Sequence, residues 1–441
     1  MATEYKHRPI GLPVPDGRLT RLARLGSMAV GVAGNVAWNG GRQLVSGQRP
    51  RLDDLLLTPA NAARITSQLA QMRGAAMKMG QLLSMEGGDF LPQELADILG
   101  HLRADAHYMP PAQLKKVLAA NLGADFLKRF KRFNVRPIAA ASIGQVHRAE
   151  TKDGRDVALK VQYPGVRRSI DSDVSNVAQL LRLSGLLPRE LDISPMLEEA
   201  KRQLHEEADY QREGEMLDRF GELLQDDPRF VVPRRHEDLT TETILGMDYV
   251  EGDPIENLAD APQETRDDAM GALLDLLVKE LFSFNLLQTD PNFANYRFNS
   301  QTGQIVLLDF GAARPITPAL AAQYRALLRA GVSGDREDRR AAMIDIGFFA
   351  VDTEARHQTQ ILDMFELAME PMRAGGMFDL TDTELADRLR AAGMEMAAER
   401  EFWHIPPMDT LYVQRKMAGI YLLAGRLKAR INLDPLLRAA L

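Results

Sequence analysis

The sequence predicts an α+β protein of two lobes, an antiparallel-sheet lobe followed by a mainly helical lobe, with an N-terminal helical extension before them. Three observations lead to this prediction. Helical periodicity dominates residues 52–129, strand-like segments follow one another within residues 130–252, and helical periodicity returns in residues 253–441. A chain of 441 residues with 45% hydrophobic and 26% charged residues is long and apolar enough to build such lobes.

Residues 1–51 form a basic segment with a composition of its own. They hold eight Lys and Arg against two acidic residues, a net charge of +6 in a chain of net charge −7. The apolar stretch 28–38 is too short for a transmembrane helix, which needs about 20 residues. Arginines precede it, and no cleavage region of a signal peptide follows. Two interpretations stay open: an amphipathic helix on an anionic membrane surface, or a basic tail without fixed structure.

The helical extension begins at Thr58-Pro59, which suit an N-cap and a first helical turn. Apolar residues follow near the 3.6-residue spacing of a helix, at Ile65, Leu69, Met72, Met79 and Leu83. Lys78 interrupts the apolar face, and Gln81 lies about one turn further on, so the two can act together. From the residues alone, Lys78 either extends to solvent or meets a carboxylate.

Three strand-like segments, 134–138, 145–150 and 156–162, predict the antiparallel sheet, and Asp153-Gly154 makes the turn between the last two. In the third segment alternate side chains share a face, which places Lys160 opposite the apolar Val157, Leu159 and Val161.

A helix is then predicted from Ser194-Pro195 to about Leu224, with the carboxylates of Glu206, Glu207, Asp209 and Glu213 along it. Further strands are expected around 231–232 and over 243–250. The turn cluster 252–254 indicates the passage between the lobes.

Four features in chain order match the needs of phosphoryl transfer: a cation on the phosphates, oxygen ligands for magnesium and a group that positions the nucleophile. The first is a loop of small residues whose backbone N–H groups can approach phosphate oxygens, namely Ala139, Ala140, Ala141, Ser142, Ile143 and Gly144. The second is Lys160, since a charge on an apolar strand needs a partner, and the carboxylates of the following helix are candidates.

The third feature is Asp290, which precedes Asn295 by five positions, the spacing of the protein-kinase catalytic loop. The fourth is Asp309-Phe310-Gly311, directly after the apolar segment 305–308. In these roles Asp290 orients the nucleophile, while Asn295 and Asp309 hold Mg²⁺. The order of the four features predicts a bilobal protein-kinase-like fold that binds ATP or ADP with Mg²⁺. By their place in this order, Met247, Asp248 and Val250 occupy the gatekeeper and hinge positions that receive adenine.

Three short motifs then carry a more specific resemblance. Lys78-Met79-Gly80-Gln81 is similar to the K-x-G-Q motif of the UbiB/AarF family of atypical kinase-like proteins, which is tied to ubiquinone biosynthesis. Ala140-Ala141-Ser142 lies in that family's alanine-rich loop, and Glu207-Ala208-Asp209 matches its E-x-D motif. The resemblance extends from about residue 60 to about residue 315. It implies a kinase-like fold whose K-x-G-Q segment covers the place of a protein substrate and lines the nucleotide site with Lys78 and Gln81.

The chain also departs from ordinary protein kinases. Gln288-Thr289 replace the His-Arg of the catalytic loop, the helix start Thr317-Pro318 follows Gly311 without a long activation segment, and the phosphate loop is rich in alanine. We therefore expect ATP hydrolysis, or phosphorylation of a small or lipid-like molecule, in support of ubiquinone biosynthesis at a membrane surface. The alternatives are a nucleotide-binding pseudokinase scaffold for lipid-processing enzymes and, third, an ordinary protein kinase.

The ion-pair partner of Lys160 is open between two carboxylates, because six helical positions place Glu207 and Glu213 about 120° apart. We favour Glu213 for Lys160 and Glu207 for Lys78. The absence of cysteine excludes disulfides and thiol chemistry, and the histidines lack metal-ligand spacing. Expected partners are a nucleotide, an anionic membrane surface, a quinone-like lipid and proteins of ubiquinone biosynthesis, with no nucleic acid. The expected location is cytoplasmic, peripheral on the inner face of a membrane.

Overall fold

The computed structural model describes residues 69, 72–87, 108–183, 193–381, 384–398 and 406–441. These residues divide into two compact units. Unit 1 takes its residues from Met1–Ser84, Leu91–Gly214 and Arg235–Tyr249, and unit 2 from Met85–Phe90, Glu215–Arg234 and Val250–Leu441. The basic segment 1–51 and the predicted helix start at Thr58 lie outside the described residues.

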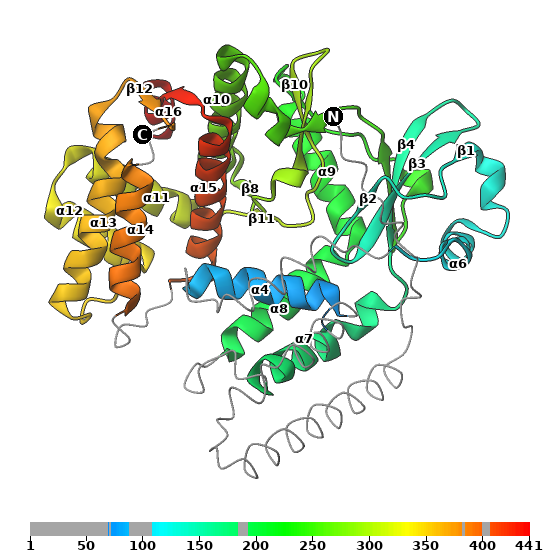
Figure 1. The fold of residues 1–441 in the computed structure, drawn as a ribbon, viewed down its shortest axis with the longest axis horizontal. Helices are drawn as coiled ribbons and strands as arrows, with labels where there is room; N and C mark the ends of the chain where they lie inside the picture. Colours follow the sequence, from blue (N-terminus) through cyan, green and yellow to red (C-terminus); the bar gives the residue numbers. More distant parts are fainter. Residues whose placement is uncertain (1–68, 70–71, 88–107, 184–192, 382–383, 399–405) are drawn as a thin grey trace, which may run out of the picture. The chain divides into compact units, whose positions relative to one another are not determined.

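The centre of unit 1 is a five-stranded antiparallel sheet (Figure 1). Its strands are β1 (Phe130–Phe133), β2 (Ala139–Ala140), β3 (Gly144–Thr151), β4 (Asp156–Gln162) and β6 (Ile244–Asp248). The order is β1-β3-β4-β6, and β2 pairs with β3. Strand β4 lies between two partners, and every residue after its first is buried. Its apolar face packs with buried residues of α6 (Pro111–Leu122), so Lys160 projects from the opposite face.

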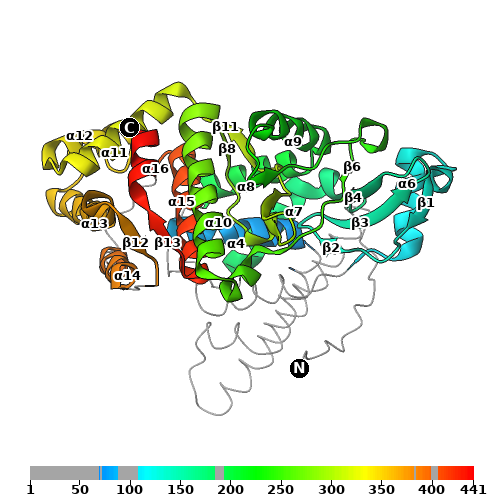
Figure 2. The same ribbon diagram turned by 90° about the horizontal axis from the view of Figure 1, so that it is seen from above.

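The other helices of unit 1 are α4 (Arg73–Gly87) up to Ser84, α7 (Val166–Leu183), α8 (Ser194–Glu207) and the start of α9 (Tyr210–Leu224). Helix α4, in blue, lies beside α8, in green, in both Figure 1 and Figure 2. Of the predicted apolar face, Leu69, Met72 and Met79 are buried; Ala75, Ala76 and Leu82 of α4 are buried as well.

Two local predictions in unit 1 are wrong. The segment 134–138 is no strand: Asn134 and Ile138 donate hydrogen bonds to β3, but Pro137 between them has no N–H to continue a ladder. The helix expected from Ser194 to Leu224 breaks into α8 and α9. At the break the carboxylate of Asp209 accepts a hydrogen bond from the backbone N–H of Arg212 at 3.1 Å, which starts a new helix.

Unit 2 holds a four-stranded sheet of order β5-β10-β9-β7, in which β10 runs parallel to β5 and antiparallel to β9. The strands are β5 (Phe230–Val231), β7 (Asp253–Pro254), β9 (Tyr296–Asn299) and β10 (Gln304–Leu307). A second pair joins β8 (Leu286–Gln288) to β11 (Ala313–Pro315), and a third joins β12 (Met377–Asp379) to β13 (Arg430–Asn432). The loops after β8 and β10 contain the two acidic motifs.

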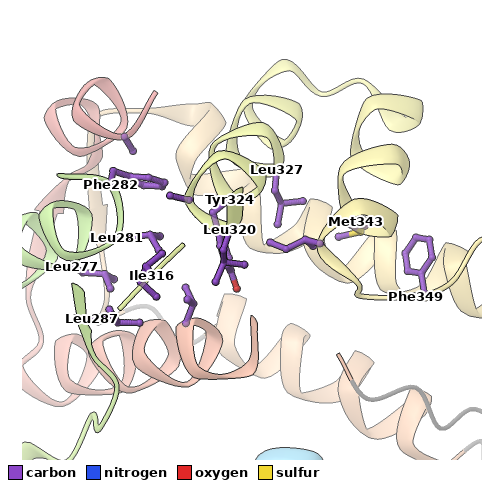
Figure 3. Close-up of a cluster of buried hydrophobic side chains, with 14 of the residues drawn as sticks. Leu277, Leu281, Phe282, Leu287, Ile316, Leu320, Tyr324, Leu327, Met343 and Phe349 are labelled. Carbon is purple, nitrogen blue, oxygen red and sulfur yellow. The ribbon is translucent and has the colours of Figure 1, made fainter. Parts of the chain in front are cut away.

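Helices make up most of the remainder of unit 2. They are α10 (Gln263–Lys279), which continues into a π-helical turn (Glu280–Phe284), α11 (Pro318–Ser333), α12 (Arg336–Ile346), α13 (Ala355–Ala374), α14 (Glu384–Ala398), α15 (Met408–Leu427) and α16 (Leu433–Ala440). Their shared core gathers Leu281, Phe282, Ile316, Leu320 and Tyr324 (Figure 3). No helix among the described residues is long and apolar enough to cross a membrane.

Helix α11 begins where the sequence indicated. The side-chain oxygen of Thr317 accepts a hydrogen bond from the N–H of Leu320 at 3.1 Å, and Pro318 occupies the first turn. Because β11 ends at Pro315, the chain between Gly311 and α11 has no room for a long activation segment.

Candidate nucleotide and phosphoryl-transfer site

In unit 1, Lys160 on β4 forms a buried ion pair with Glu213 in the first turn of α9. The Lys160 Nζ lies 2.7 Å and 2.9 Å from the two carboxylate oxygens of Glu213, and the residues are 8% and 1% exposed. The ammonium also lies 5.2 Å from the ring centroid of Tyr210, whose negative face attracts a cation. A desolvated lysine is held charged by such partners. The pairing of Lys160 with Glu213 that the sequence favoured is confirmed.

Glu207, at the end of α8, joins the three short motifs of unit 1. One of its carboxylate oxygens forms an ion pair with Lys78 of α4, and the other accepts a hydrogen bond from Ser142 Oγ at 2.9 Å. Lys78 is only 6% exposed, so of its two open interpretations the carboxylate partner is correct. Gly80 also lies on α4, whereas the side chain of Gln81 is outside the described part of the chain.

Helix α4 approaches the alanine-rich loop closely. A Cβ atom on Gly74 would lie 2.8 Å from Ile143 Cγ2, so glycine is what permits this contact. The loop itself is a tight turn, since the N–H of Ala141 donates to the carbonyl of Gly144 at 2.9 Å. A Cβ on Gly144 would lie 2.6 Å from the carbonyl oxygen of Val161. Two glycines therefore permit the conformation of the loop: Gly74 of α4, which contacts it, and Gly144 at its end.

The residues predicted as gatekeeper and hinge lie at and after the end of β6. Met247 is buried and pairs with Ala158 of β4, while Val250 is half-buried just beyond the strand. The carboxylate of Asp248 lies 2.8 Å from Nε2 of His236, which is itself buried. Burial and this contact fix the side chains here, and the adenine role of these positions stays a prediction.

In unit 2, the loop after β8 brings Asp290 and Asn295 together. Asn295 Nδ2 donates to Asp290 Oδ2 at 3.1 Å, and the carbonyl of Asn295 accepts from the N–H of Leu308 at 3.1 Å. That second bond places Asn295 beside the end of β10, where Asp309 follows. Asp309 Oδ1 accepts a hydrogen bond from the N–H of Gly311 at 3.0 Å.

Asn295 and Asp309 are oxygen ligands of the type that Mg²⁺ takes. Over the described ranges, no group of three or more His, Cys, Asp or Glu is placed to hold a metal ion. A two-residue set suits magnesium that completes its shell with phosphate and water oxygens, so these residues fit the ion that the sequence implied.

Three buried residues near this loop were not predicted as functional. Lys416 of α15 donates to the hydroxyl of Tyr296 at 2.8 Å and lies 3.7 Å from Oε2 of Glu280 in the π-helical turn. Burial raises the pKa of Glu280 to about 6, although the Lys416 charge opposes that shift. One signal could have found this cluster: Lys416 interrupts a stripe of buried side chains at helical spacing, formed by Tyr412, Ile420, Leu423 and Leu427.

The family model of the ABC1 atypical kinase-like domain matches residues 101–343, more than half of the chain. The chain belongs to the ABC1 atypical kinase-like family. This confirms the UbiB/AarF resemblance and the protein-kinase-like α+β fold that the sequence predicted.

Curated relatives match this ABC1-family chain over almost its whole length. The mitochondrial atypical kinase COQ8 of Saccharomyces cerevisiae is 39% identical over 422 residues, which cover 95% of this chain and 84% of the relative. The mitochondrial atypical kinase COQ8B of Rattus norvegicus is 37% identical over 421 residues, covering 95% and 79%. Among solved structures, Rv3197 from Mycobacterium tuberculosis, in complex with erythromycin, superposes with a TM-score of 0.59 at 23% identity, covering 86% of this chain and 94% of that one. This last likeness concerns the fold alone.

Proposed function

We propose that this ABC1-family protein binds Mg²⁺–ATP and either hydrolyses it or transfers its phosphoryl group to a small or lipid-like molecule, in support of ubiquinone biosynthesis at a membrane surface. The observation that carries the proposal is the buried ion pair of Lys160 and Glu213. A lysine on the third strand of a kinase sheet, paired with a helix carboxylate, must be in place for catalysis in protein kinases.

The proposed roles follow the chemistry of each side chain. Lys160 holds the phosphates together with the backbone N–H groups of loop 139–144. Asn295 and Asp309 hold the magnesium ion, which supplies neutralising charge to the phosphate oxygens. Asp290 orients the attacking oxygen of water or of the acceptor and accepts its proton. Met247, Asp248 and Val250 line the adenine position, and ADP is the product.

Two observations support a small or lipid-like acceptor over a protein. Helix α4 contacts the alanine-rich loop at Gly74 and is held there by the ion pair between Lys78 and Glu207. In addition, α11 begins at Pro318, so the residues between Gly311 and this helix form no long segment on which a peptide could lie. We propose that Lys78 and Gln81 line the nucleotide site on this side.

Magnesium-dependent binding and single-turnover phosphate release test the roles separately. Asp309→Asn should weaken Mg²⁺–ATP binding, whereas Asp290→Asn should leave binding intact and lower turnover by about 10²–10⁴-fold, the usual effect of losing a general base. The exposed Asp352→Asn serves as control. A wild-type protein without magnesium-dependent nucleotide binding would refute the proposed function, and unchanged turnover in Asp290→Asn would refute the role of Asp290.

A second candidate function has an observation in its favour. Ser142 in the phosphate loop is bonded to Glu207, and alanines replace the flexible glycines there, which suits a pseudokinase that binds ATP as a conformational ligand and organises lipid-processing enzymes. Nucleotide binding without phosphate release in a single-turnover experiment would favour this scaffold. An ordinary protein kinase would require phosphorylation of a protein in trans.

The proposed membrane position and the proposed link to quinones are supported by features outside the nucleotide site. The basic segment 1–51 suits a peripheral position on an anionic membrane face, and the family resemblance suggests the quinone link. Quinone content in cells that lack the protein tests that link. An unchanged quinone level would remove ubiquinone biosynthesis from the proposal and leave the nucleotide chemistry standing.

A further inference from the structure

Helix α15 contacts the catalytic loop of unit 2 through two consecutive basic residues, Arg415 and Lys416. The loop 288–295 contains no Lys or Arg of its own. Its cationic contacts come instead from a helix more than a hundred residues later in the chain. The two residues point to different parts of the loop and have different partners.

Arg415 contacts the carboxylate proposed to position the nucleophile. Its Nη2 donates to Asp290 Oδ1 at 3.2 Å, while Asn295 Nδ2 donates to Asp290 Oδ2 at 3.1 Å. Two donors on different oxygens fix the rotation of the carboxylate about its bond to the chain. Each carboxylate oxygen offers two lone pairs, so both donors leave room for a substrate hydroxyl or water.

Lys416 contacts the residue that precedes Thr289 and Asp290 in the loop. Its Nζ lies 3.3 Å from Gln288 Oε1, and Gln288 Nε2 donates to the backbone carbonyl of Asp309 at 3.1 Å. An ammonium group can only donate, so it must face the oxygen of the amide. The amide nitrogen is thereby directed at Asp309. Lys416 thus sets the orientation of Gln288, which in turn holds the backbone of the proposed metal ligand.

The backbone of α15 is fixed against the same loop. A Cβ on Gly419 would lie 2.1 Å from Pro291 Cβ and 2.8 Å from its Cγ. Real Cβ atoms do not approach so closely, so the helix reaches this position only with glycine there. The close contact keeps the Arg415 and Lys416 side chains at a constant distance from the loop.

From these contacts we propose that α15 is the positioning element of the phosphoryl-transfer site. Arg415 orients Asp290, and Lys416, through Gln288, orients Asp309. The inference rests on the proposed function for its consequences in turnover. It assigns separate effects to the two residues: loss of the Arg415 contact affects the chemical step, and loss of the Gln288 relay affects magnesium.

The role of Arg415 in orienting Asp290 is tested by measuring kcat and KM for ATP in Arg415→Gln, Arg415→Lys and the control Arg426→Gln. Arg426 is on the same helix, 59% exposed at its side chain, and contacts Glu256 instead. Misplacing a catalytic group by about 1 Å can cost about 100-fold, so we expect such a loss in kcat for Arg415→Gln, with little change in KM and partial rescue by lysine. In an Asp290→Asn background the same substitution should add little. Full kcat in Arg415→Gln, or an additive effect in the double variant, would overturn the orienting role of Arg415.

The contact from Lys416 through Gln288 to Asp309 is tested in Gln288→Leu. This variant leaves Lys416 its hydrogen bond to Tyr296 and its ion pair with Glu280, and so avoids an unpaired buried charge. Loss of a group that supports a metal ligand costs about 10–100-fold in metal affinity. We expect the Mg²⁺ concentration for half-maximal turnover to rise by that factor, with kcat recovered at saturating Mg²⁺. An unchanged Mg²⁺ requirement would overturn the relay.

Hydrogen exchange keeps the inference separate from the proposed function. If the wild type proves inactive, Arg415→Gln should still speed amide exchange in residues 286–295, while Arg426→Gln should not. Faster exchange in Arg415→Gln, together with an inactive wild type, would refute the proposed function and support α15 as a positioning element. Equal exchange in both variants would overturn the positioning element whatever the activity.

Discussion

Replacing Lys416 with Met leaves the Glu280 carboxylate buried without its counter-ion. In the wild type their side chains are 3% and 1% exposed, and Nζ lies 3.7 Å from Oε2. Methionine fills much of the volume of a lysine stem, so the lost charge dominates over any cavity. Removing one partner of a buried ion pair costs about 3–5 kcal/mol. Since the buried hydroxyl of Tyr296 also loses the hydrogen bond that it accepts from Lys416, we expect the upper part of that range at about pH 8.

The loss of stability in Lys416→Met should depend on pH because Glu280 titrates between the two pH values at which unfolding can be measured. Burial raises its pKa to about 6 from an ordinary 4.5, and the Lys416 charge restrains that rise, so the variant should have a still higher pKa. The folded state then binds a proton more tightly than the unfolded chain. Stability therefore falls as the pH rises from 4.5 through the folded pKa, by about 1.4 kcal/mol for each unit between the two values. At about pH 5 Glu280 is protonated and needs no counter-ion.

Urea unfolding at about pH 8 and pH 5 measures this difference. The set comprises the wild type, Lys416→Met, the double variant Glu280→Gln/Lys416→Met and the exposed control Arg426→Met. Burial alone would lower the pKa of Lys416, but the Glu280 carboxylate and the hydrogen bond to Tyr296 outweigh it and raise the pKa, so this lysine is charged at about pH 8.

Two results are expected if the unpaired Glu280 carboxylate causes the loss of stability. The single variant should lose much less stability at the lower pH, and the double variant should regain most of the loss at the higher pH, because no buried charge remains unpaired. Equal losses at both pH values, or a double variant as unstable as the single one, would refute the unpaired Glu280 carboxylate as the cause of the loss.

Three further predictions concern other parts of the chain. Glu213→Gln should leave the ammonium of Lys160 with a neutral partner and cost about 3 kcal/mol in urea unfolding, together with weaker ATP binding by calorimetry; an unaltered affinity would contradict the role of the pair. Gly144→Ala places a methyl group 2.6 Å from the carbonyl of Val161 and should cost about 1–3 kcal/mol, seen as a lower melting temperature, while wild-type melting would contradict the contact. A chain starting at Leu52 should lose flotation with anionic liposomes, and undiminished binding would remove residues 1–51 from the membrane proposal.

The sequence predicts well what local periodicity decides. Alternation along residues 156–162 placed Lys160 on the face opposite the apolar one, and the structure keeps it there, paired with Glu213. The favoured pairs, Lys160 with Glu213 and Lys78 with Glu207, are both found, although the two carboxylates lie on separate helices, α8 and α9, rather than on the single helix assumed for their phase. The strand alternation holds because it depends only on neighbouring residues along one element.

Local periodicity failed where a side chain competes with the helix. Nothing in the apolar spacing of residues 194–224 marks a break, yet Asp209 ends one helix and caps the next. Short polar side chains that bond to the backbone offer the chain an alternative to a continuous helix. The break is what places Glu207 at a helix end.

The contacts of α15 were beyond sequence reasoning for another reason. Arg415 and Asp290 are separated by 125 positions, and no spacing rule connects them. Lys416 could have been noticed on its apolar stripe, but its partners come from the π-helical turn and from β8 and β9. Tertiary packing alone selects them.

The carboxylate of Glu207 holds two parts of the chain at once. One oxygen forms an ion pair with Lys78 of α4, and the other accepts a hydrogen bond from the hydroxyl of Ser142. The docking of the extension and the conformation of the alanine-rich loop are therefore thermodynamically coupled through a single acid group. An event that draws this carboxylate away removes both attachments at once, so the extension and the loop should loosen together rather than in turn.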